Sequence, residues 1–133
     1  MGKIIYTGVF FDASALYAAM NKHIPRKKLH RQIENPHVTV QYKPKTVNTS
    51  LFGQEVAFTV TGYAVDENNE GVAVRFSEDG LSQELRELLE TIKVPHITLS
   101  VSKNGRPVDT GRLHFEACQP FSIRGTYRPF YGA

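Results

Sequence analysis

The chain has 133 residues, of which 41% are hydrophobic and 22% are charged, and its formal net charge is +3. This length and composition suit one globular domain with its own core, and they argue against wholesale disorder. Because Cys118 is the only cysteine, the sequence excludes an internal disulfide and a cysteine-rich zinc site, and it favours a reducing compartment.

The first half of the chain is predicted to contain three strands and one helix. In chain order these are a strand over 4–11, a helix over 13–22, a strand that starts at His37 and a strand over 58–62. Asp12 or Ser14 can supply the N-cap of the helix. The polar run 66–71 predicts a hairpin turn rather than a domain boundary, so the whole of residues 1–133 is expected to form one domain.

The second half is predicted to repeat this order. Its elements are a strand over 71–76, a helix over 81–93, a strand that starts at His96 and a strand over 121–131. The helix carries leucines at helical spacing, and Ser77 or Asp79 can supply its N-cap. No apolar run is long enough to span a membrane, and the N-terminal residues lack the apolar stretch of a signal peptide, so we expect a cytoplasmic protein.

An internal repeat is the most informative feature of the sequence. The segment Pro-His-Val-Thr-Val at 36–40 returns as Pro-His-Ile-Thr-Leu at 95–99. A second echo, Phe-Thr-Val-Thr-Gly at 58–62 and Phe-Ser-Ile-Arg-Gly at 121–125, follows each copy. We therefore predict an α+β fold of two similar lobes, with duplicated strand-helix-strand-strand units over about 3–65 and 71–131 and antiparallel sheets that form a central groove.

The two His-x-Thr strands place their polar side chains on one face. Because side chains alternate along a strand, His37 and Thr39 share one face, as do His96 and Thr98, while aliphatic residues occupy the other. If the two halves pair about a pseudo-twofold axis, two imidazoles and two hydroxyls meet in one groove. One neutral histidine can then accept a proton while a protonated one donates to a leaving oxygen, and the threonines can donate to phosphate oxygens. This chemistry needs no metal or other cofactor.

Two copies of His-x-Thr on strands of a duplicated α+β unit resemble the 2H phosphoesterase superfamily. That superfamily includes LigT-like RNA 2′,3′-cyclic phosphodiesterases, the cyclic-phosphodiesterase domains of tRNA ligases, and enzymes that cut 2′-5′ or cyclic oligonucleotides. The resemblance implies that His37 and His96 are the catalytic acid/base pair and that Thr39 and Thr98 bind the phosphate. Which histidine is the acid stays open, and so does the structural alternative of two strand histidines in an inactive duplication.

Further candidates for substrate binding are basic and aromatic. Arg124 and Arg128 alternate on one face of 121–131, where they either clamp a phosphate or belong to a solvated outer face. Tyr6 either stacks on a base or packs in the core. The basic cluster 26–31, which ends at Arg31, is either a solvated loop or a phosphate contact.

The sequence thus predicts a metal-independent phosphodiesterase that acts on 2′,3′-cyclic phosphate of RNA ends or nucleotides. We expect an RNA or nucleotide substrate, no membrane, no metal, and a monomer. The alternatives are a 2′-5′ or cyclic-oligonucleotide phosphodiesterase, a non-catalytic nucleotide- or RNA-binding module of the same fold, and a zinc site at the two histidines.

Overall fold

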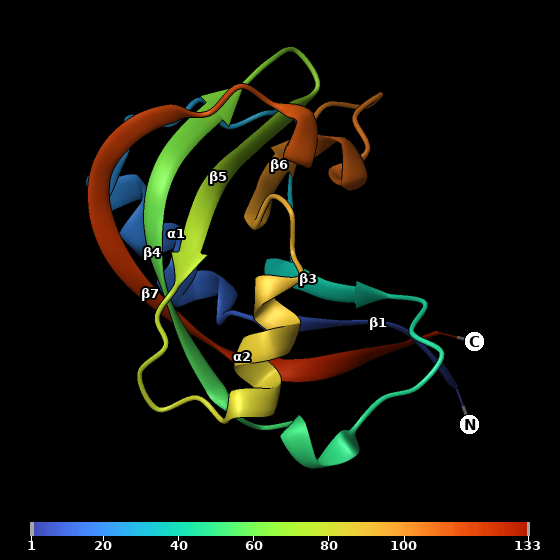
Figure 1. The fold of residues 1–133 in the computed structure, drawn as a ribbon. Helices are drawn as coiled ribbons and strands as arrows, with labels where there is room; N and C mark the ends of the chain where they lie inside the picture. Colours follow the sequence, from blue (N-terminus) through green and yellow to red (C-terminus); the bar gives the residue numbers. More distant parts are fainter. Residues whose placement is uncertain (1, 133) are drawn as a thin grey trace.

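A computed structural model describes residues 2–132, in which seven strands form one antiparallel sheet and are accompanied by two α-helices (Figure 1). The strands are β1 (Lys3–Phe10), β2 (Arg31–Gln32), β3 (His37–Tyr42), β4 (Glu55–Val65), β5 (Asn69–Phe76), β6 (His96–Val101) and β7 (Glu116–Gly132). The helices are α1 (Ala13–His23) and α2 (Gln83–Glu90), with short 3₁₀ helices η1 (Thr49–Leu51) and η2 (Pro107–Arg112). The prediction of a mixed α+β class is confirmed at this level.

The strands follow the order β2-β6-β5-β4-β7-β1-β3. Because β4 and β7 pair with each other along their length, hydrogen bonding continues from one half of the chain to the other. The strands therefore form a single sheet, where the sequence had suggested separate ones. If each strand is exchanged for its counterpart in the sequence repeat, β3 for β6, β1 for β5 and β7 for β4, the same order of those six strands results, read from the opposite end of the sheet.

The sheet is strongly curled, and the connection between β2 and β3 shows why. These strands lie at opposite ends of the strand order, yet only residues 33–36 join them. A flat sheet of this size would hold its end strands about 29 Å apart at about 4.8 Å per strand. The extended connection spans at most about 18 Å. The two ends must therefore approach each other, and β3 and β6 are in contact.

The helix boundaries differ in how well the sequence predicted them. Asp12 caps α1 by accepting a hydrogen bond from the backbone N–H of Ala15 at 2.9 Å, one of the two caps predicted. The prediction of a second helix over 81–93 is wrong at both ends. Ser82 is the N-cap of α2, and Gly80 adopts a positive φ of 76° in the turn before it. The Thr91 hydroxyl donates to the carbonyl of Leu88 and helps to end the helix.

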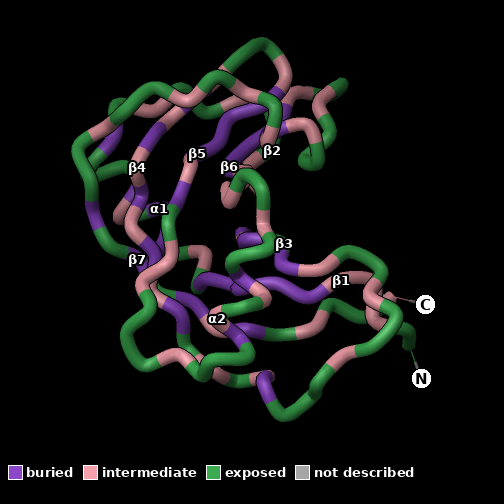
Figure 2. The backbone as a smooth tube through the Cα atoms, in the orientation of Figure 1, coloured by how far each residue is buried: buried purple, intermediate pink, exposed green. Residues whose placement is uncertain are grey.

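The core lies on one side of β3 and β6, as the alternating pattern of the His-x-Thr strands predicts. Val38 and Val40 of β3 are buried, and so are Ile97 and Leu99 of β6. Figure 2 shows these buried stretches interrupted by less buried positions along the strands. The polar members of both strands are left facing away from this core. Within residues 2–132 no helix is long and apolar enough to cross a membrane.

Candidate active site

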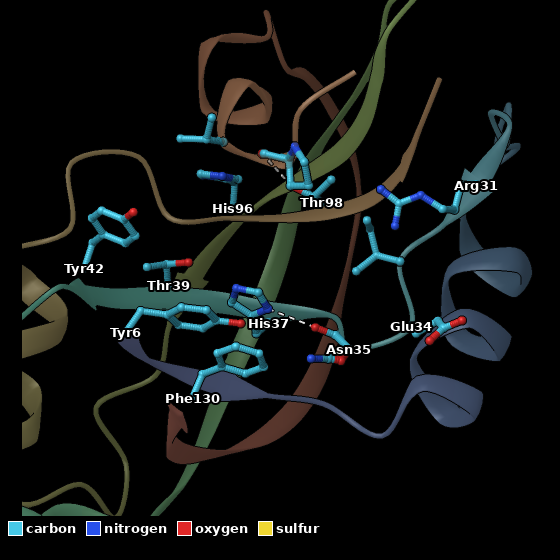
Figure 3. A pocket seen from close by; sticks show the side chains of 13 residues that line it. Tyr6, Arg31, Glu34, Asn35, His37, Thr39, Tyr42, His96, Thr98 and Phe130 are labelled. Atoms are coloured by element: carbon cyan, nitrogen blue, oxygen red, sulfur yellow. Dashed lines mark hydrogen bonds between the residues drawn. The ribbon is translucent and has the colours of Figure 1, made fainter. Parts of the chain in front are cut away.

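A cavity of about 840 Å³ lies between the two halves of the sheet and collects side chains from both (Figure 3). The His-x-Thr residues of β3 and β6 all line it, namely His37, Thr39, His96 and Thr98. We call these four side chains the quartet. Tyr6, Tyr42 and Phe130 line one end, and the connection after β2 lines the other (Figure 3). The curl of the sheet is what brings residues so distant in sequence into one cavity.

Each histidine ring is held by the same backbone contact. His37 Nδ1 lies 2.9 Å from the carbonyl oxygen of Asn35, and His96 Nδ1 lies 2.7 Å from that of Val94. A carbonyl oxygen can only accept, so Nδ1 carries the hydrogen in both rings. In the neutral imidazole Nε2 is then the free base, and in the imidazolium it is the second donor. The two rings face each other across the cavity (Figure 3).

The two threonines of the quartet occupy matching places in the sheet. Thr39 pairs with Gly8 of β1, and Thr98 pairs with Gly71 of β5. In both strand pairs the register shifts immediately before that glycine. A Cβ on Gly8 would lie 2.8 Å from a backbone oxygen of β3, and one on Gly71 would lie 2.8 Å from a backbone oxygen of β6. Glycine therefore permits the close strand approach beside each threonine.

Aromatic rings surround His37 on the β1 side. The Tyr6 ring stacks on His37 with centroids 4.8 Å apart and on Phe130 with centroids 4.9 Å apart. Phe10 lies 5.0 Å from the His37 ring. Burial among these rings lowers the pKa of His37, and the nearby His96 lowers it further, against the opposing effect of the Asn35 carbonyl. His37 is thus neutral at neutral pH and able to accept a proton.

His96 rests against η2 instead of aromatic rings. A Cβ added to Gly111 would come within 3.0 Å of the ring atom Cε1 of His96 and within 3.3 Å of Nδ1. The ring therefore packs directly on a backbone that has no side chain at that point. Any larger residue at position 111 would displace the ring or the segment.

The two threonine hydroxyls have different environments. Thr98 Oγ1 donates to the carbonyl of Pro107 at 3.0 Å and lies 2.8 Å from Thr110 Oγ1, which in turn accepts from the Asn69 side chain at 3.0 Å. Within residues 2–132 no hydrogen bond involves the side chain of Thr39, and this residue is exposed in the cavity. Thr39 is therefore free to donate to a ligand, whereas Thr98 must exchange a bond to do so.

The structure does not bring every predicted binding residue to the cavity. Arg124 donates to Glu55 at 3.1 Å and borders a separate, smaller hollow beside α1. The guanidinium of Arg128 lies 4.7 Å from the centre of the Phe10 ring and does not line the cavity. Tyr6 does line it, but its ring lies between His37 and Phe130 and supports the histidine (Figure 3).

The connection between β2 and β3 supplies lining residues that the sequence analysis did not assign to the site. Ile33, Glu34 and Asn35 line the cavity, and Arg31 of β2 lies beside them. Among the residues within 2–132 that line the cavity, Arg31 is the one arginine or lysine. It belongs to the basic cluster 26–31, but nothing in the spacing of that cluster shows which member turns inward.

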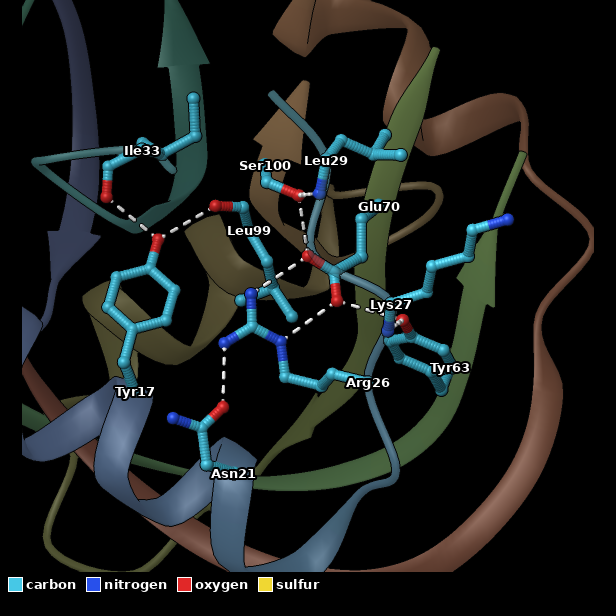
Figure 4. Close-up of polar contacts among 10 residues, drawn as sticks. All are labelled: Tyr17, Asn21, Arg26, Lys27, Leu29, Ile33, Tyr63, Glu70, Leu99 and Ser100. Atoms are coloured by element: carbon cyan, nitrogen blue, oxygen red, sulfur yellow. Dashed lines mark hydrogen bonds and ion pairs between the residues drawn. The ribbon is translucent and has the colours of Figure 1, made fainter. Parts of the chain in front are cut away.

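A buried ion pair fixes the segment that precedes this connection (Figure 4). Arg26 donates to both carboxylate oxygens of Glu70 at 2.8 Å, and Tyr63 and Ser100 donate to the same carboxylate. Burial by itself raises the pKa of Glu70, but these hydrogen bonds outweigh it and hold the pKa below its usual value. The Tyr17 hydroxyl completes the region by donating to the carbonyls of Ile33 and Leu99.

Comparison with known proteins assigns the chain to no family. No protein-family model matches the chain, and no curated protein matches it. Within residues 2–132 no three histidine, cysteine, aspartate or glutamate side chains are grouped as ligands of one metal ion. The chemistry open to the cavity is therefore that of its own side chains.

Proposed function

We propose that the protein is a metal-independent phosphodiesterase that hydrolyses 2′,3′-cyclic phosphate on RNA ends or nucleotides. The observation that carries this proposal is the pair of imidazoles in one cavity, each with Nδ1 bound to a backbone carbonyl and Nε2 left for a ligand. Two such groups can serve as base and acid on the two sides of one phosphorus atom.

The reaction assigns different roles to the two histidines. Neutral His37 takes a proton from water through Nε2, and the water oxygen forms a bond to phosphorus. The bond from phosphorus to one ribose oxygen breaks, and protonated His96 gives that oxygen a proton. Thr39 donates to the non-bridging oxygens, where negative charge accumulates, and Thr98 does so when it exchanges its bond to the Pro107 carbonyl. The lowered pKa of His37 supports its role as the base.

We also propose that the chain is one duplicated, bilobal domain of the 2H phosphoesterase type, with repeats over about 3–65 and 71–131. The matching strand order and the paired glycine–threonine positions support this duplication. We expect the protein to act as a monomer in the cytoplasm, and the single cysteine is consistent with a reducing environment.

The direct test is to incubate the protein with RNA that ends in 2′,3′-cyclic phosphate, in excess chelator, and to identify the product. Conversion to a 2′- or 3′-monophosphate end supports the proposal. Loss of turnover in chelator, with recovery on addition of Zn²⁺, would replace it with a zinc site at the histidines. Ligand binding without turnover, unchanged in His37→Ala and His96→Ala, would replace it with a binding module.

A second candidate is cleavage of 2′-5′ or cyclic oligonucleotides by the same groups. The cavity favours it because about 840 Å³ lies near the upper end of the range for small-ligand sites, about 300–1,000 Å³. Kinetics on a panel of 2′,3′-cyclic mononucleotides, 2′-5′ oligoadenylate and cyclic dinucleotides distinguish this candidate function from the first. The substrate with the highest kcat/KM decides between them.

A further inference from the structure

The side chains that line the cavity extend from Tyr42 at one end to Arg31 at the other, and the quartet lies between them (Figure 3). Tyr42, of which 67% is exposed, lies at one end near Tyr6. Arg31 lies at the other end, beyond Thr98. A phosphate held between the two histidines would therefore leave room on both sides, and the two ends have different chemistry.

Arg31 has a fixed backbone and a free side chain. It starts the two-residue strand β2, where it is paired with Val101 of β6, and the backbone N–H of Ile33 donates to the Leu99 carbonyl at 2.9 Å. Within residues 2–132 no carboxylate pairs with Arg31, although Arg26, Arg86 and Arg124 each pair with a glutamate. In Figure 3 its guanidinium points from β2 toward the side of Thr98.

The nearest acidic lining residue does not neutralise this site. Glu34 belongs to the same connection, but its carboxylate points away from the quartet (Figure 3). No hydrogen bond or ion pair within residues 2–132 joins Glu34 to Arg31. An exposed guanidinium at the end of the cavity attracts anions, and its planar fork matches the oxygens of a phosphate.

We infer that Arg31 forms a second phosphate-binding subsite, which holds the phosphate next to the scissile one. The preferred substrate is then an oligonucleotide end or a nucleotide with a second phosphate, not a cyclic mononucleotide with one. This inference rests on the proposed phosphodiesterase function and specifies its substrate. Arg31 acts on affinity for the longer substrate and takes no part in the proton transfers.

The test compares two substrates that differ in one phosphate, adenosine 2′,3′-cyclic phosphate and its 5′-phosphorylated form. The unaltered protein is expected to have the higher kcat/KM on the second. Arg31→Ala should lower that value about 10- to 100-fold, the factor that one charged hydrogen bond supplies, chiefly through KM. Turnover of the first substrate, which lacks the second phosphate, should fall by a smaller factor. Arg31→Lys should restore part of the difference, since it keeps the charge and loses the fork.

Arg75→Ala is the matched control, because Arg75 is exposed on β5, does not line the cavity and pairs with no carboxylate of residues 2–132. It should leave both substrates unaffected. Equal kcat/KM of the unaltered protein on both substrates would overturn the inference. So would an equal loss on both in Arg31→Ala, which would place Arg31 at the scissile phosphate.

A binding measurement separates this inference from the proposed function. Calorimetry with adenosine 3′-phosphate and adenosine 3′,5′-bisphosphate needs no turnover. Tighter binding of the bisphosphate that is lost in Arg31→Ala supports the subsite, even if no cyclic phosphate is hydrolysed and the proposed reaction fails. Equal affinity for both ligands, or no binding of either, overturns the subsite, even if cyclic phosphate is hydrolysed.

Discussion

Thr98 and Thr110 place their hydroxyl oxygens 2.8 Å apart, at the point where η2 meets β6. Thr110 is fully buried and accepts from the Asn69 side chain, while Thr98 donates to the Pro107 carbonyl. The hydroxyl proton of Thr98 is therefore already in a hydrogen bond within the protein. Thr39, its counterpart in the repeat, has no such bond within residues 2–132, so the duplicated motif has two different threonines.

Alanine at the two threonines should accordingly have different effects. Thr39→Ala should lower kcat/KM about 10- to 100-fold, since it removes a donor to the phosphate, with little change in stability. Thr98→Ala should lower kcat/KM as well. Unlike Thr39→Ala, it should in addition lower the free energy of unfolding by about 1–2 kcal/mol, because it leaves Thr110 and the Pro107 carbonyl with fewer hydrogen-bond partners. Urea unfolding and steady-state kinetics measure both. Equal stability of the two variants would contradict the asymmetry.

Removal of either imidazole should abolish most of the turnover. His37→Ala and His96→Ala should each lower kcat about 10²- to 10⁴-fold, the usual contribution of one positioned acid or base. His114→Ala is the control, since His114 is exposed and lies outside the cavity. Circular dichroism should show all three variants folded. Full activity of a folded His37→Ala variant would remove the acid/base mechanism.

The pH dependence follows from the burial of His37. Its pKa is lowered from 6.5, so the base form persists to lower pH than for an exposed histidine. The titratable groups that face it are His96 and Tyr6, and burial raises the pKa of Tyr6, which keeps that phenol neutral. We expect kcat/KM to rise with pH through a midpoint below 6.5. An acid limb at or above 6.5 would contradict the assignment of His37 as the base.

The contact between Gly111 and His96 gives a test that leaves the quartet intact. Gly111→Ala would put a Cβ 3.0 Å from the ring and move it away from its position. Because a small misplacement of a catalytic group is costly, kcat should fall about 10- to 100-fold. Arg112→Ala, next along η2 and exposed, is the control and should leave kcat unchanged. Unchanged kcat in Gly111→Ala would show that the ring position is not critical.

The buried ion pair should dominate the response of stability to mutation and acid. Arg26→Ala leaves the Glu70 carboxylate buried without its cation and should cost about 3–5 kcal/mol. Arg86→Ala breaks an exposed pair with Glu90 and should cost less than about 1 kcal/mol. Denaturant unfolding measures both. Similar losses in the two variants would contradict a buried, coupled network.

The sign of the acid effect follows from the lowered pKa of Glu70. The unfolded chain binds a proton at this carboxylate more readily than the folded protein does. Stability from this group is therefore complete above pH 4.5 and is lost as the pH falls below that value through the folded pKa. Glu70→Gln should be less stable at neutral pH and should lose less stability on acidification. A steeper loss in this variant than in the unaltered protein would contradict the assignment.

The sequence by itself determined that two helices and the six longer strands exist and how polarity alternates along the His-x-Thr strands, but it gave no sign of the two-residue strand β2. Strand alternation put His37 and Thr39 on one side and Val38 on the other, because that pattern depends only on local backbone geometry. The cap at Asp12 is equally local. The start of α2 was missed because Ser77, Asp79 and Ser82 are all good N-caps. In the structure the chain turns at Gly80, so the helix begins after Ser82.

Only the tertiary structure decided which side chains share the cavity. Arg124 and Arg128 fitted the pattern of a phosphate clamp as well as Arg31 did, but Arg124 pairs with Glu55 outside the cavity, and Arg128 packs on Phe10. The deciding factor is the curl of the sheet, which the short connection over 33–36 imposes on strands distant in sequence. Such long-range geometry depends on how all the strands pair, so no local pattern of residues contains it.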